Sequence, residues 1–164
     1  MDKISPCLWF DGDAEEAARF YTSLFPNSQI DSVDRSPADT PSGPEGAVLT
    51  VNFTLGGRSF IGLNGGPDFK FSEAISMSID CADQAEVDRY WDALIDDGGE
   101  PSVCGWLKDR FGLSWQVVPR QLIDMYNSPD RDGARRAMEA MLKMTKLDVA
   151  ELERAFAGEA VPVG

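Results

Sequence analysis

The sequence predicts an α+β fold: two tandem β-α-β-β-β modules whose curled mixed sheets surround a cleft, followed by a C-terminal helical extension. Residues 12–25 align with residues 82–95 at a constant offset, which indicates a duplicated unit. A strand pattern precedes each of these segments and further strand patterns follow it. Beyond Pro119 the pattern becomes helical. We therefore expect a first module over residues 1–72, a second over 73–120 and the extension over 121–164, all in one compact domain.

Each copy of the repeat has the pattern of a helix start. Asp13 and Asp83 are both followed three residues later by Glu, so the Asp side chain can accept from a first-turn N–H and Glu lies at the positive end of the helix dipole. Apolar residues then recur at helical spacing. A proline ends the first pattern and a glycine pair ends the second. The expected helices are Asp13–Phe25 and Asp83–Asp96.

Alternating or continuous apolar runs predict the strands. They are Ile4–Phe10, Gln29–Val33, Ala47–Leu55 and Ser59–Leu63 in the first module, then Ile75–Asp80, Pro101–Leu107 and Leu113–Val118 in the second. Polar and apolar residues alternate along Ala47–Leu55 and along Ile75–Asp80. The polar face of these strands either lines a cleft or faces water, as in many antiparallel sheets. The segment Asp34–Gly46, rich in Pro, Gly and Ser, is a lid or a disordered loop, and we favour disorder.

Three further helices are expected in the extension. They cover Gln121–Asn127, a stretch entered by Ser128-Pro129, and a stretch entered at Asp148 with Glu151 three residues on. Large apolar side chains recur along one side of the last two helices: Met138, Met141, Leu142, Leu152 and Phe156. Methionine at helical spacing usually packs in a core, and a subunit contact is the other explanation.

The composition excludes several classes of function. A net charge of −13 and a pI near 4.3 oppose binding to nucleic acid or to an anionic membrane. Met1–Pro6 lacks a leader pattern and no later stretch is long and apolar enough to span a membrane, so we expect a cytoplasmic protein. The 3 cysteines form no close pair, which favours reduced thiols. The chain has 0 histidines, and so lacks the commonest metal ligand and the commonest general base.

Six strings of the sequence are distinctive: Leu8–Gly12, Ala14–Ala17, Phe25–Ser28, Leu63–Pro67, Cys104–Asp109 and Gly112–Pro119. Together they resemble the PhnB-like family, also labelled 3-demethylubiquinone-9 3-methyltransferase, of the glyoxalase/bleomycin-resistance/extradiol dioxygenase (vicinal oxygen chelate) superfamily. The resemblance implies a homodimer with a small-molecule ligand. The residues do not support the methyltransferase label, because the sequence lacks the Gly-rich turn between a strand and a helix that such cofactor sites use. We therefore expect no cofactor.

The resemblance also implies four metal-ligand positions, one on the first and one on the fourth strand of each module. These positions fall near Pro6, at Ile61 or Gly62, at Ala74 and at Gln116. Three of the four offer no side-chain donor, and one neutral amide does not hold a divalent ion. We therefore expect no metal.

The remaining polar and aromatic residues of the two modules define the candidate ligand site. They are Gln116, Ser114, Ser76, Ser78, Asn52 and Trp106. These side chains suit orientation of a ligand by hydrogen bonds and stacking, so the first hypothesis is a metal-independent small-molecule binding protein. The alternatives are an enzyme, either a lyase, dioxygenase or transferase-like member of the superfamily or an activity based on Asp80 or Cys104, and a structural or regulatory dimer that acts through its C-terminal helices.

Overall fold

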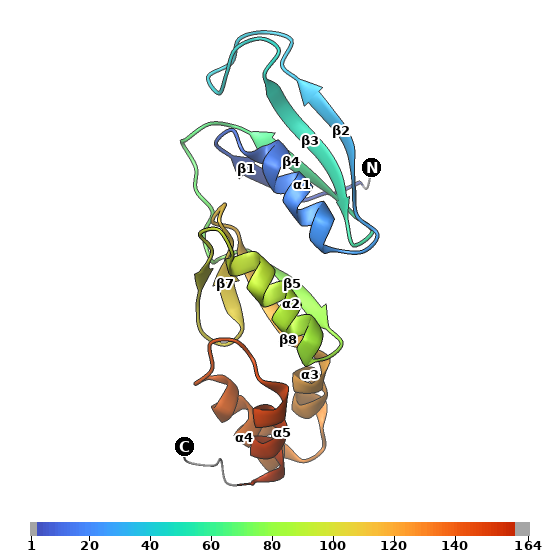
Figure 1. Ribbon diagram of the computed structural model, residues 1–164, viewed down its shortest axis with the longest axis vertical. Helices are drawn as coiled ribbons and strands as arrows, with labels where there is room; N and C mark the ends of the chain where they lie inside the picture. Colours follow the sequence, from blue (N-terminus) through green and yellow to red (C-terminus); the bar gives the residue numbers. More distant parts are fainter. Residues whose placement is uncertain (1–2, 160–164) are drawn as a thin grey trace. The chain divides into compact units, whose positions relative to one another are not determined.

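The computed structural model describes residues 3–159 and contains two compact units, unit 1 through Phe71 and unit 2 from Ser72 (Figure 1). Unit 1 comprises β1 (Cys7–Phe10), α1 (Ala14–Leu24), β2 (Gln29–Arg35), β3 (Val48–Leu55) and β4 (Arg58–Asn64). Unit 2 comprises β5 (Ser76–Cys81), α2 (Gln84–Ile95), β6 (Glu100–Pro101), β7 (Trp106–Lys108), β8 (Ser114–Pro119), α3 (Arg120–Asn127), α4 (Arg131–Met141) and α5 (Val149–Ala157).

The two sheets have the same topology. Their strand orders are β1-β4-β3-β2 and β5-β8-β7-β6. In each sheet the first strand pairs in parallel with the fourth, and the other pairs are antiparallel. The helix after the first strand makes the crossover that a parallel pair requires. The predicted α+β fold, with two similar β-α-β-β-β modules built on mixed sheets and a helical C-terminal part, is confirmed.

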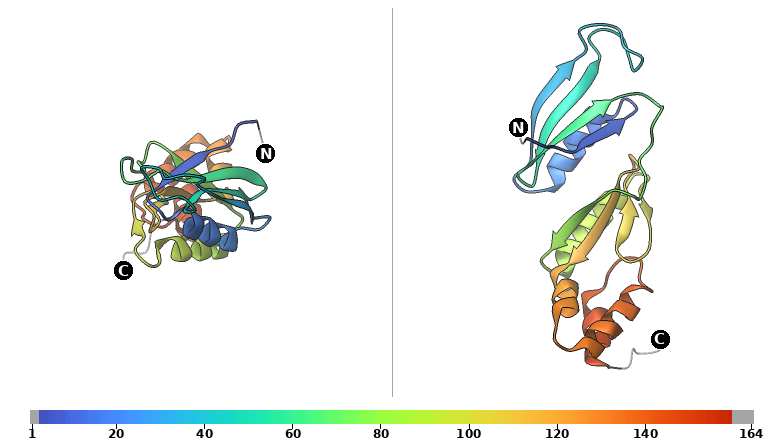
Figure 2. Two further views of the ribbon diagram at one scale, coloured as in Figure 1. Left: turned by 90° about the horizontal axis from the view of Figure 1, so that it is seen from above. Right: turned by 180° about the vertical axis from the view of Figure 1, so that it is seen from behind.

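One helix covers one face of each sheet. On the apolar side of α1, Ala17 and Tyr21 are fully buried, and Phe53 of β3 lies beneath the helix. The corresponding side of α2 buries Trp91 and Leu94. We call the other side of each sheet, which faces away from α1 or α2, its open face; that of the unit 2 sheet is in front in the right-hand view of Figure 2.

The two helix starts are built differently. At α2 the Asp83 carboxylate accepts from the Glu86 N–H (3.0 Å) and caps the helix, and the Glu86 carboxylate accepts from the Ala82 N–H (2.8 Å), one residue before the N-cap. At α1 the expected Asp13 cap is wrong. The first-turn N–H, that of Ala14, donates instead to Asn64 Oδ1 at 2.9 Å, so a residue distant in sequence caps this helix.

Two predicted segments differ from the structure. Pro101–Leu107 is not one strand, because residues 102–105 turn between β6 and β7 with Cys104 at φ 60° and Gly105 at φ 80°. The disorder expected for Asp34–Gly46 is also wrong. There β2 continues through Arg35, the buried Ser36 donates its N–H to the Ala47 carbonyl (2.8 Å), and residues 40 and 43 form a bridge.

Helices α3 to α5 form a small apolar core of their own within unit 2. Its buried members are Leu122, Met125, Ala137, Met144, Leu147 and Leu152. Met141 and Phe156 of the predicted stripe pack against this core, whereas Met138 and Leu142 are 45% and 60% exposed.

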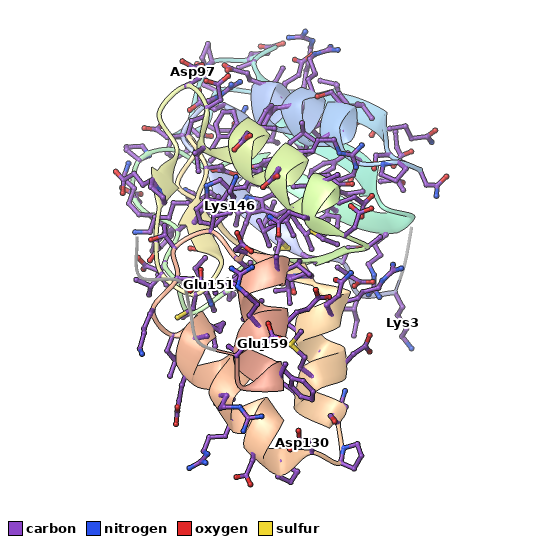
Figure 3. The ribbon with its side chains drawn as sticks, turned by 60° about the horizontal axis from the view of Figure 1, so that its bottom comes forward. Lys3, Asp97, Asp130, Lys146, Glu151 and Glu159 are labelled. Atoms are coloured by element: carbon purple, nitrogen blue, oxygen red, sulfur yellow. The ribbon has the colours of Figure 1, made fainter. Side chains whose placement is uncertain are left out.

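Polar contacts join this helical part to α2. The Gln84 side chain accepts from the Val149 N–H (2.8 Å) and donates to the Leu147 carbonyl (3.1 Å). Lys146, labelled in Figure 3, forms an ion pair with Asp88 (Nζ–Oδ1 2.8 Å). The segment between α4 and α5 is therefore fixed on the rest of unit 2.

Candidate functional site

The open face of the unit 2 sheet carries five of the six predicted ligand-binding residues. Across the strands, Ser78 pairs with Gln116 and Gln116 with Trp106, while Ser76 pairs with Ser114. Because side chains alternate along a strand, these residues share one face, and the buried Trp115 and Val117 between them point toward α2. The sequence pattern thus placed these five side chains on one surface.

Gln116 lies at the centre of this surface. Its Nε2 donates to Ser76 Oγ at 2.9 Å, across one step of the parallel β5–β8 pair. Gln116 is half-buried and Ser78 is exposed. The amide is thereby held in place with its other hydrogen-bonding groups at the sheet surface, an arrangement suited to orienting a polar group of a ligand.

Ser114 is the most unusual polar residue of the site. It is 1% exposed, and its Oγ has no hydrogen-bond partner among residues 3–159. A buried hydroxyl without a partner destabilises a protein by about 1–3 kcal/mol, so its presence in a folded protein calls for an explanation. Sequence reasoning had placed Ser114 beside Gln116 on the same face, but its burial depends on segments that lie over it.

Ser114 belongs to the wall of a cavity of about 290 Å³, which we call the unit 2 cavity. Its lining residues come from the segment before β5, from the 102–105 turn, and from β7 and β8: Glu73, Ser102, Val103, Cys104, Trp106, Leu107, Lys108 and Ser114. Carbon surface dominates this wall, with a few polar atoms, as in typical small-molecule sites.

One ion pair contributes to the cavity wall. Lys108 Nζ lies 2.5 Å from Glu73 Oε1. The hydrogen bond to Lys108 lowers the pKa of the Glu73 carboxyl, and Glu73 raises the pKa of Lys108 by the same contact. Sequence reasoning missed both residues, although Lys108 lies two positions after Trp106 and therefore on the same face of the strand.

The β7–β8 connection is fixed by a buried carboxylate. Asp109, 2% exposed, accepts at Oδ1 from the N–H groups of Phe111 (2.9 Å) and Leu113 (3.0 Å). Its Oδ2 accepts from Trp115 Nε1 at 2.8 Å. This carboxylate holds together the residues that lead into Ser114, so Trp115 is part of the support of the site.

Asn52, the sixth predicted residue, lies in unit 1 on the open face of the other sheet. Its Nδ2 donates to Ser32 Oγ and to Asp34 Oδ2, both at 2.9 Å. It lines a separate hollow of about 340 Å³ whose wall includes Asp31 and Thr54. The structure thus assigns Asn52 to different surroundings from those of Gln116.

The Asn64-Gly65-Gly66 string of the sequence has a structural role. Asn64 caps α1 and donates Nδ2 to the Val48 carbonyl at 2.9 Å. The Trp9 indole occupies the space that a side chain at Gly65 would fill, and its Nε1 donates to the Gly66 carbonyl at 2.8 Å. These residues build unit 1 and add no polar group to the unit 2 cavity.

The positions implied for metal ligands do not form a donor set. Pro6, whose carbonyl accepts from the Ile61 N–H at 3.0 Å, and Ile61 itself have no side-chain donor, and the Gln116 amide is engaged with Ser76. Among residues 3–159, no three His, Cys, Asp or Glu side chains come together in a way that would hold an ion. The residues present at these positions do not fit a divalent metal.

The two side chains considered for catalysis differ in their surroundings. Asp80 is exposed on β5 and forms an ion pair with Arg120 (Oδ2–Nε 2.8 Å). Cys104 is half-buried in the wall of the unit 2 cavity.

No helix in the described part of the chain is long and apolar enough to cross a membrane.

Comparison with known proteins places this fold in a family. The family model described as 3-demethylubiquinone-9 3-methyltransferase matches residues 2–118. A PhnB protein structure from Bacillus cereus is 36% identical with a TM-score of 0.65, covering 72% of this chain and 99% of its own. A protein from Pseudomonas aeruginosa is 21% identical with a TM-score of 0.59, covering 73% and 98%, and shows the fold alone.

A glyoxylase/bleomycin resistance protein/dioxygenase domain from Frankia is 16% identical with a TM-score of 0.45, covering 73% of this chain and 92% of its own. No curated protein matches the chain.

Proposed function

The chain belongs to the 3-demethylubiquinone-9 3-methyltransferase family, and from that premise we propose that it is a metal-independent protein of the glyoxalase/bleomycin-resistance type that binds a small molecule in the unit 2 cavity. Ser114 is the observation that carries the proposal. Ser114 is 1% exposed and lines the cavity, and its hydroxyl, which has no partner among the described residues, would be paired once a ligand supplied the missing hydrogen bond.

The ligand chemistry follows from the cavity wall. Trp106, Val103 and Leu107 offer carbon surface for a largely apolar body. Ser114 both donates and accepts, so it suits one hydroxyl or carbonyl group of the ligand. Ser76, opposite Ser114, and Gln116, on the neighbouring row of the same face, supply the next polar contacts. We therefore expect a ligand that is mostly hydrocarbon with a small number of oxygen atoms.

Binding is favoured over methyl transfer, despite the description of the family model. The turns from strand to helix are Asp11–Asp13 before α1 and Ala82-Asp83 before α2. Neither is the Gly-rich turn whose backbone closely approaches a nucleotide cofactor at a helix N-terminus. Binding is also favoured over acid–base catalysis by Asp80, because an exposed carboxylate in an ion pair has no partner group positioned for proton transfer.

Benzyl alcohol, an apolar ring with one hydroxyl, is a suitable probe of this cavity. We expect it to shift the NMR signal of the Trp106 indole N–H, assigned through Trp106→Phe, because Trp106 lines the cavity. The indole of Trp91, 4% exposed beneath α2, is the internal control and stays unshifted. Equal shifts at both indoles, or none at Trp106 up to the solubility of the alcohol, would contradict the proposal.

We further propose that the protein is a homodimer that contacts its copy through the C-terminal helices. Ile123, Met138 and Leu142 are 46%, 45% and 60% exposed, whereas the rest of the apolar surface there packs on its own core. Exposed large apolar side chains on neighbouring helices commonly mark a contact surface. Sedimentation velocity at micromolar concentration is expected to give a dimer, and Leu142→Glu a monomer. A wild-type monomer under these conditions would refute this proposal.

A further inference from the structure

Cys104 is held in an unusual conformation in the wall of the unit 2 cavity. Its φ of 60° lies in the left-handed region, which residues other than glycine seldom adopt. Its N–H donates to the Met144 carbonyl at 2.8 Å, and the Gly105 N–H donates to the Thr145 carbonyl at 2.8 Å. The segment between α4 and α5 thereby fixes the turn that carries the thiol.

The same cavity contains a second group that indicates a ligand. Ser114 is 1% exposed, its Oγ has no hydrogen-bond partner among residues 3–159, and the residue lines the cavity together with Cys104. The two residues lie toward opposite ends of the β7–β8 pair. Gly105 accepts at its carbonyl from Val117 N–H, whereas Lys108 is opposite Ser114. From Ser114 to Val117 the chain advances by three residue steps along β8. At about 3.3 Å per step, this is a distance of about 10 Å.

The other two thiols lie elsewhere and differ in reactivity. Cys81 is fully buried, and burial together with the neighbouring carboxylates raises its pKa to about 12. Cys7 is exposed in unit 1, and partial desolvation raises its pKa. Since the thiolate is the reactive form, both shifts oppose attack by these cysteines. Cys104 is the thiol that a ligand held by Ser114 would meet.

We propose that Cys104 is a covalent capture site for ligands that carry an α,β-unsaturated carbonyl group, with their polar end at Ser114. This inference rests on the proposed binding function. In the step, the sulfur forms a bond to the β-carbon of the ligand and the S–H proton leaves to solvent. The alkene electron pair moves to the α-carbon, which takes a proton from water. The product is a thioether, and the addition has no leaving group and needs no oxidant.

The acrylamide of 4-(hydroxymethyl)benzylamine tests this inference. It joins the benzyl alcohol group to an acrylamide and, when extended, has a length comparable to the distance between the two residues. Holding the alkene beside the thiol is expected to make Cys104 react at least about tenfold faster than Cys7, measured by mass spectrometry of peptides. Plain acrylamide, which has no group for Ser114, is expected to react with Cys7 at least as fast as with Cys104.

Three variants make the outcome specific. Cys104→Ser is expected to abolish the rapid adduct, and Cys7→Ser to leave it unchanged. Ser114→Ala is expected to slow the reaction at Cys104 by roughly tenfold, the loss of one hydrogen bond, without changing the plain acrylamide reaction. If benzyl alcohol shifts the Trp106 indole but Cys104 reacts no faster than Cys7, the capture inference is wrong and the binding function stands. If the indole does not shift either, both are wrong.

Discussion

Asp109→Ala is expected to destabilise the protein by about 3–5 kcal/mol, because it leaves buried donors without their acceptor. The Asp109 carboxylate accepts from the N–H groups of Phe111 and Leu113 and from the Trp115 indole, and the residue is 2% exposed. Water cannot replace the carboxylate without entering the interior. Urea unfolding followed by tryptophan fluorescence measures the change in the free energy of unfolding.

Asp80→Ala is the matched control for the loss of a carboxylate. Asp80 is paired with Arg120 on the surface, where both side chains are more than half exposed, and such a pair contributes about 0–1 kcal/mol. If Asp109→Ala does not fold, Trp115→Phe removes a single donor and is expected to cost about 1–2 kcal/mol. Equal stabilities of Asp109→Ala and Asp80→Ala would show that the buried carboxylate does not support the β7–β8 connection.

Leu147→Ala is expected to destabilise the protein by about 2–5 kcal/mol and to loosen one wall of the unit 2 cavity. Leu147 is 1% exposed in the core formed by α3 to α5, and its side chain packs directly against Gly105. The adjacent Met144 and Thr145 carbonyls accept from Cys104 and Gly105. Hydrogen exchange of these two amides should therefore accelerate along with the loss of stability.

The control for this truncation is Ile75→Ala, since Ile75 is 68% exposed. Removing an exposed side chain of similar size changes stability by about 0.5 kcal/mol or less. If the Cys104 and Gly105 amides exchange at the same rate in Leu147→Ala and in Ile75→Ala, the C-terminal helices do not support the cavity.

The duplicated modules could be predicted because their signals are local. Helical spacing of apolar residues and the Asp83 cap of α2 need only neighbouring residues, and the alternation through Ser76 and Ser78 placed both on one face. Asp13 showed the same local pattern and was misjudged. Its helix is capped by Asn64 of β4, a contact made only once the chain has folded.

The turn at Cys104 and the burial of Ser114 could not be predicted from the residue pattern of a single strand. Val103 and Leu107 have the alternation of a strand, so the turn at Cys104 was not predicted, and a cysteine gives no signal for a positive φ. Ser114 was predicted to be a site residue. Its burial and its lack of a hydrogen-bond partner among the described residues are properties of the folded chain, which no pattern within β8 encodes.

The most direct test of the unit 2 cavity as a ligand site is a binding cycle with benzyl alcohol and toluene, which differ mainly in the hydroxymethyl group that Ser114 would contact. The ratio of the toluene Kd to the benzyl alcohol Kd is measured by NMR titration for the wild-type protein and for Ser114→Ala. Because the hydroxyl of Ser114 supplies about one hydrogen bond, this ratio is expected to fall roughly five- to tenfold in the variant. The same ratio in both proteins would contradict the account, since it would show that the buried hydroxyl contacts no ligand.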